Sequence, residues 1–114
     1  MSVSPEYREW VVEQLRHAGT VTGRSMFGGY ALYLDGAIFA LIDDDVVYFK
    51  VDDSNRPGYE AAGMGPFRPM GDEQVMQYYE VPADVLEDPD RLCEWADAAA
   101  AVSRRKTRKP RKRK

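Results

Sequence analysis

The chain has 114 residues, 44% of them hydrophobic, and a formal net charge of −3, which together predict one globular domain. This charge combines two unlike parts, since residues 1–102 hold seven basic and all 19 acidic side chains, whereas residues 103–114 hold nine basic side chains and no acidic one. No long apolar run occurs, so we expect neither a membrane-spanning helix nor a secretory signal. The chain has a single cysteine, Cys93, which excludes an intrachain disulfide and favours a cytoplasmic location.

Residues 4–19 predict the first helix. Ser4 can cap its N-terminus and Pro5 suits its first turn. The apolar side chains recur at helical spacing and form one stripe: Tyr7, Trp10, Val11, Leu15 and Ala18. We expect this helix to end at Gly19.

Three strand-like runs follow, at residues 29–35, 37–42 and 46–51. Asp35-Gly36 between the first two is a strong signal for a two-residue hairpin. The second run is apolar on both faces, which is typical of a central strand, and the third alternates. We expect the three runs to form an antiparallel meander.

The remainder of the domain predicts a short helix within residues 54–63, a second hairpin that turns at residues 70–72, and a last helix that starts at Asp88. The fold class is therefore α+β with two layers, an antiparallel sheet with helices on one face, in the order α-β-β-β-α-β-β-α.

The pair Gly28-Gly29 raises the question of a phosphate-binding loop. Such a loop places its glycines after a strand and before a helix, but here an alternating strand pattern follows, and neither a third glycine nor a Gly-Lys-Ser/Thr motif is present. We interpret the pair as a bulge, bend or close backbone contact where a strand begins.

Three segments carry a family resemblance: "RSMFGGYALYLDGAIFALIDDDVVYFKVDD" (24–53), "YEAAGMGPF" (59–67) and "MQYYEVPADVLEDPDRLCEWADAA" (76–99). In this order they resemble the N-terminal domain of the TfoX/Sxy competence-regulator family, over about residues 5–103. The resemblance implies a two-layer α+β domain, a link to transcriptional control of DNA uptake in bacteria, and a coactivator rather than an enzyme. Full-length members carry a second, C-terminal domain, whose place is taken here by a basic tail. We therefore divide the chain into a TfoX-like domain, 1–103, and a tail, 104–114.

Catalytic and metal chemistry find little support in the sequence. The lone histidine, His17, is interpreted as a helix-end or surface residue, and Cys93 as an inert thiol. The aspartates at 43–45, 52 and 53 lack the spacing of a calcium loop and are typical of turns. We expect no catalytic residue, no metal and no cofactor.

The three side chains Arg24, Tyr48 and Lys50 are cationic or amphipathic groups within the strand region of a strongly acidic domain. If the third strand buries Val47 and Phe49, Tyr48 and Lys50 point to the opposite face. Two interpretations stay open: an exposed face with snorkelling side chains, or a site for an anion or a partner protein.

The C-terminal segment is the strongest functional signal, and its cations are Arg104, Arg105, Lys106, Arg108, Lys109, Arg111, Lys112, Arg113 and Lys114. We expect the segment to be disordered when unbound and to bind nucleic acid, DNA above all, without sequence preference. The alternatives are an acidic partner protein or the chain's own acidic domain, an anionic lipid surface without an anchor, and a solubility or targeting role. We expect no membrane association, a possible nucleoid location, and a transcription-machinery protein as a second partner.

Overall fold

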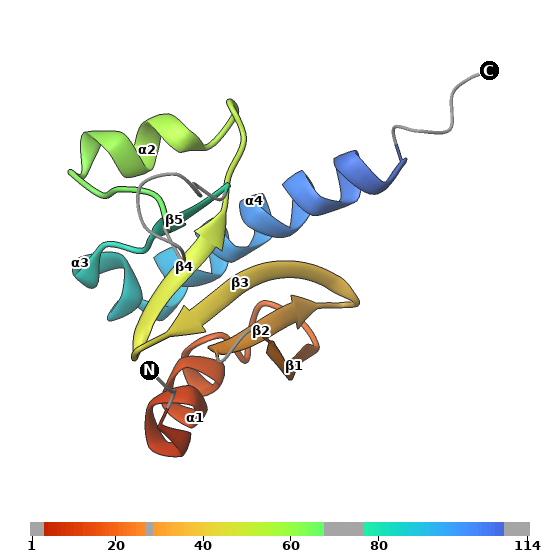
Figure 1. Cartoon of the computed structure of the whole chain (residues 1–114), viewed down its shortest axis with the longest axis vertical. Helices are drawn as coiled ribbons and strands as arrows, with labels where there is room; N and C mark the ends of the chain where they lie inside the picture. The colour runs from red at the N-terminus through yellow and green to blue at the C-terminus, as the bar shows by residue number, and fades with distance from the viewer. Residues whose placement is uncertain (1–3, 27–28, 68–76, 109–114) are drawn as a thin grey trace.

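The computed structural model describes residues 4–26, 29–67 and 77–108 (Figure 1). Its elements in chain order are α1 (Pro5–Gln14), β1 (Val21–Met26), β2 (Gly29–Leu34), β3 (Ala37–Asp43), β4 (Val46–Lys50), α2 (Arg56–Ala61), β5 (Tyr78–Glu80), α3 (Ala83–Leu86) and α4 (Pro89–Arg108).

The five strands form one antiparallel sheet in the order β1-β2-β3-β4-β5. Figure 1 shows α4, in blue, running along the sheet from the region of α3 toward the C-terminus. Residues of all four helices join one buried cluster with residues of β2, β3 and β4. The predicted α+β class, antiparallel sheet and helical layer are therefore confirmed.

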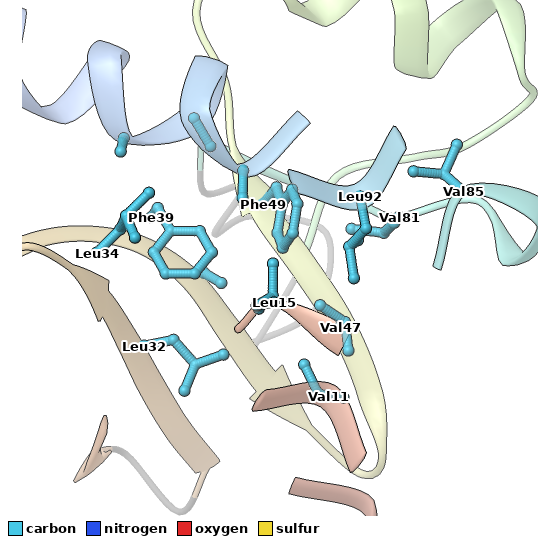
Figure 2. Packing of buried hydrophobic residues seen from close by; sticks show 14 of the residues in the cluster. Val11, Leu15, Leu32, Leu34, Phe39, Val47, Phe49, Val81, Val85 and Leu92 are labelled. Carbon is cyan, nitrogen blue, oxygen red and sulfur yellow. The ribbon is translucent and has the colours of Figure 1, made fainter. Parts of the chain in front are cut away.

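The main core lies between the helices and one face of the sheet (Figure 2). Val47 and Phe49 are buried there by the alternation of β4, as predicted, and the Phe49 ring meets the Phe39 ring edge-on with centroids 5.4 Å apart. Leu92 of α4 and Val11 of α1 are fully buried in the same cluster. This packing covers one face of the sheet. On the opposite face Ala31, Leu41 and Tyr78 form a second, smaller buried cluster.

The first strand, β1, is absent from the sequence prediction. Its sequence, VTGRSM, shows no apolar alternation, and residues 22–25 are exposed. It becomes a strand because it pairs with β2 over six residues, from Val21 opposite Leu34 to Met26 opposite Gly29. The short helix α3 is a second element that was not predicted, since four residues are too few for a periodic pattern.

The first helix begins as predicted but ends earlier. The Ser4 hydroxyl accepts a hydrogen bond from the Tyr7 backbone N–H at 3.2 Å. The predicted end at Gly19 is wrong, since the helix ends at Gln14 and residues 15–18 form tighter turns. There the Leu15 N–H is shared between the Val11 and Val12 carbonyls, which is common at a helix end.

The structure describes the two segments that flank the predicted second hairpin turn, and they pair with each other. The Phe67 N–H donates to the Tyr78 carbonyl at 2.7 Å, and Pro66 forms a bridge with Tyr79 of β5. The predicted turn at residues 70–72 lies outside the described residues.

The last helix is longer than the sequence predicts. It begins at Pro89, directly after the expected cap Asp88, and continues to Arg108. The prediction of a disordered tail from residue 104 therefore does not hold for residues 104–108. Lysine and arginine are good helix formers, and cations near the C-terminus of a helix are stabilised by its dipole, so the first part of the basic segment extends α4.

Gly29 shows what the glycine pair does; Gly28 lies outside the described residues. Gly29 is the first residue of β2, and a Cβ atom there would lie 2.6 Å from the Ile42 carbonyl oxygen of β3. The interpretation as a close backbone contact at the start of a strand is therefore confirmed for this residue.

We expect Gly29→Ala to lower the free energy of unfolding by about 1–3 kcal/mol, because the backbone oxygen it meets belongs to a paired strand. Thermal and urea unfolding followed by circular dichroism measures the loss. Gly65→Ala is the matched control, since a Cβ at Gly65 meets nothing within 4 Å. Equal stability of the two variants would contradict the close contact.

Candidate functional site

Two cations of the predicted nucleic-acid segment contact the domain itself. The Arg104 guanidinium donates to the Leu34 carbonyl at the end of β2, at 3.3 Å. Arg105 donates to the Asp52 carboxylate at 2.8 Å and to the Ser54 hydroxyl at 3.0 Å, in the loop that follows β4. The last turns of α4 therefore lie against the chain where β2 and β4 end.

The loop that receives Arg105 is held by its own hydrogen bonds. The second oxygen of the Asp52 carboxylate accepts a bond from the Ser54 N–H at 2.8 Å, and the Asp52 N–H donates to Asn55 at 2.8 Å. Hydrogen bonds to the carboxylate, first from Arg105 and then from Ser54, lower the pKa of Asp52 to about 2. The ion pair itself is half exposed, which limits its contribution to stability.

We expect Arg105→Ala to raise the pKa of Asp52 toward its ordinary value of 3.8, because the strongest donor to the carboxylate is lost. The pair stabilises the fold above pH 4 and its contribution disappears as the pH falls through about 2, since the carboxylate is protonated there. Its size is at most about 1 kcal/mol. A carboxyl NMR titration measures the pKa. Arg104→Ala is the control that leaves it low, and an unchanged pKa in Arg105→Ala would contradict the assignment.

The other predicted binding cations are placed only in part. Lys106 and Arg108 belong to α4, although their side chains are outside the described structure. The remaining five, Lys109, Arg111, Lys112, Arg113 and Lys114, lie outside the described residues.

The strand residues Arg24, Tyr48 and Lys50 are brought to one face of the sheet, opposite the main core. Cross-strand pairing forms a row from Arg24 through Ala31 and Leu41 to Tyr48, and Lys50 follows two residues along β4 on the same side. The sequence prediction that Tyr48 and Lys50 point away from Phe49 is thus confirmed. We call this surface the open sheet face, although Ala31 and Leu41 in the middle of the row are buried beneath neighbouring side chains.

The open sheet face carries aromatic rings that the sequence analysis did not single out. The Arg24 guanidinium lies 6.0 Å from the centre of the Tyr33 ring, and the Lys50 ammonium lies 5.1 Å from that of Tyr78. The rings of Tyr48 and Phe67 are 4.6 Å apart. Tyr33 alternates along β2 in the sequence, but Phe67 and Tyr78 arrive only through the long-range pairing of β5.

Carboxylates limit what the open sheet face can bind. The pKa of Tyr48 is raised by partial burial and then by the charges of Glu80, Asp43 and Asp44. An anion placed beside Tyr48 would meet these carboxylates. These charges disfavour an anion at this position.

The sequence also singled out Cys93 and several aspartates. Burial raises the pKa of the Cys93 thiol, whose sulfur lies 3.9 Å from the Gln14 carbonyl oxygen, so the unreactive thiol form is favoured. Among the described residues, no three histidine, cysteine, aspartate or glutamate side chains gather as metal ligands. No described helix has the length and apolar character to cross a membrane.

Comparison with known families finds a match to the model of the TfoX N-terminal domain over residues 13–103. Comparison with curated proteins gives no match. The matched range contains all five strands and ends directly before Arg104, so the nine clustered cations lie beyond it.

Proposed function

Since the chain belongs to the TfoX N-terminal domain family, we propose that this TfoX-like, competence-related regulatory protein binds nucleic acid, and DNA in particular, through the cations of residues 104–114. The proposal rests on one observation: nine basic side chains and no acidic one stand in the last twelve positions, at the end of a domain whose first 102 residues have the opposite charge. A polycation of this density binds phosphates because it releases their condensed counterions.

Two of the nine clustered cations have partners on the domain. Arg104 and Arg105 already donate to acceptors on the domain, which leaves seven basic residues beyond them. If all seven neutralise phosphates, the logarithm of the binding constant falls with the logarithm of salt concentration with a slope of about −6.

Binding should be non-specific. The segment has no aromatic side chain to stack on bases. Phosphate contacts position a protein on the duplex without reading its sequence. We therefore assign the segment an anchoring role.

The acidic domain is then the part that faces away from DNA. Residues 1–102 carry 19 acidic and seven basic side chains, so phosphates repel them. We propose that the open sheet face, with Arg24, Tyr48 and Lys50, holds a transcription-machinery protein near the DNA. In this proposal the protein works in the cytoplasm, at the nucleoid, and has no catalytic role.

The test is a salt series with a labelled duplex of random sequence, read by fluorescence anisotropy. We expect a steep linear decrease, with a log–log slope between about −4 and −6, and the same affinity for a second, unrelated duplex. A flat salt dependence or a strong preference for one of the two duplexes would contradict non-specific anchoring.

A second candidate function is an adaptor whose basic segment docks on an acidic protein or on its own domain. The contact of Arg105 with Asp52 and Ser54 favours this alternative for the start of the segment. The variant Asp52→Asn distinguishes docking on the chain's own domain from anchoring on DNA. Self-docking predicts a severalfold gain in DNA affinity when the acceptor loses its charge, whereas anchoring through the last seven cations predicts a change of less than about twofold.

A further inference from the structure

The outer edge of β1 has no partner strand among the described residues, because β1 is the first strand of the sheet. The Asp35 N–H donates to the Thr20 carbonyl at 2.8 Å. In an antiparallel ladder the hydrogen-bonded pairs alternate, so every second residue of β1 directs its backbone groups away from β2. These residues are Val21, Gly23 and Ser25.

A groove runs beside this edge, between β1 and α1. It has a volume of about 270 Å³, and its lining comes from three elements: Arg8, Glu9, Val12 and Glu13 of α1, Val21, Thr22 and Gly23 of β1, and Tyr30 and Leu32 of β2. Apolar side chains from these elements therefore face the same space as the charged groups of α1.

The absence of a side chain at Gly23 makes room for the Tyr30 ring, which lines the groove. A Cβ atom at Gly23 would lie 2.2 Å from the ring of Tyr30, so the ring occupies the place of the missing side chain. The Arg8 guanidinium lies 4.5 Å from the centre of the same ring. The Tyr30 ring is thus held between β1 and α1.

The edge has few of the features that normally block pairing. Strand β1 contains no proline and no lysine, its register with β2 has no bulge, and residues 22–25 are exposed. Its one charged side chain, Arg24, lies near the Tyr33 ring of β2. Edge strands are normally blocked by such features because their unpaired N–H and C=O groups otherwise pair with another chain. A regular, exposed edge beside a helix groove is the geometry in which an extended peptide adds a strand to a sheet.

We propose that the edge of β1 is a docking site for an extended segment of a partner protein, which adds as a sixth strand. Its side chains on the helix side would include an apolar residue against Val12 and Val21 and a basic residue toward Glu9, because Glu13 already pairs with Arg16. The charge of the domain favours this chemistry, since residues 1–102 have 12 more acidic than basic side chains. The partner is therefore an extended segment that combines apolar and basic residues.

The test uses Ser25, whose N–H points away from β2. Ser25→Pro removes a donor from the outer edge without removing a hydrogen bond between β1 and β2, as proline is tolerated on that side of an edge strand. Ser25→Ala keeps the donor and is the matched control. The probe is the acetylated peptide Lys-Thr-Val-Thr-Val-Lys, added to the isotope-labelled full chain and followed by amide NMR.

We expect the peptide to shift the amide signals of Val21, Gly23 and Ser25 in the natural chain and in Ser25→Ala. In Ser25→Pro the affinity should fall at least tenfold, and a peptide with glutamate in place of lysine should bind more weakly to every form. Equal peptide affinity in Ser25→Pro and Ser25→Ala would overturn the proposal, as would absent shifts at these amides. Light scattering that shows a dimer dissociated by Ser25→Pro would assign the edge to a second copy and overturn it as well.

Discussion

A chain that ends at Arg105 is expected to lose at least about a hundredfold in affinity for random duplex DNA at physiological salt. The truncation removes seven of the nine clustered cations and keeps Arg104 and Arg105, which contact the domain. The remaining domain is acidic and repels phosphates, so the residual affinity should fall below the measurable range. Fluorescence anisotropy of a labelled duplex measures the loss.

Two controls separate charge from folding in this experiment. The truncated chain should unfold at nearly the same temperature as the full chain, because the buried residues Val102 and Ser103 are retained. A full-length variant with the seven distal lysines and arginines replaced by glutamine should lose binding to the same extent, since it keeps the length and removes the charge. Duplex binding by either variant at physiological salt would show that the domain itself holds DNA.

Phe49→Ala is expected to reduce the free energy of unfolding by about 3–5 kcal/mol. Phe49 is 0% exposed and lies at the centre of the core against Phe39, with Leu92 and Val47 in the same cluster (Figure 2). Removing the ring leaves a cavity between the sheet and α4 that neighbouring side chains fill only in part. Urea unfolding measures the loss, and Phe49→Leu, which keeps most of the volume, should lose less than half as much.

This destabilised variant also tests whether DNA binding depends on the basic segment alone or also on the folded domain. If the distal cations anchor the chain, Phe49→Ala should bind random duplex DNA as well as the natural chain does, even where the domain is partly unfolded. A parallel loss of stability and DNA affinity would mean that the folded domain takes part in binding.

The strands of the meander could be predicted because each carries its own local signal. The alternation of apolar and polar residues indicated the buried side of β4. The pair Asp35-Gly36 indicated the hairpin between β2 and β3, and in the structure both residues have the positive φ that such a turn requires, 49° for Asp35 and 90° for Gly36. These features depend on neighbours in the chain. Strand β1 could not be found in this way, because it is a strand only through its pairing with β2.

The candidate site also has a part that local sequence signals predict and a part that depends on long-range contacts. The basic segment and the side shared by Tyr48 and Lys50 were predicted from charge and from the two-residue period of a strand. The contact between Arg105 and Asp52 was not, because 52 residues separate the two positions in the sequence and only the packing of α4 on the sheet brings them together.

By itself the sequence determined the family, the α+β class, the buried side of β4 and the position of the cations, since composition, short motifs and periodicity are local properties of a chain. The tertiary structure alone decided that β1 is an exposed edge beside a groove, that Arg24 joins Tyr48 and Lys50 on one face, and that α4 carries the first cations onto the domain. The physical reason is that strand pairing and helix packing depend on groups distant in sequence, whose meeting no local pattern encodes.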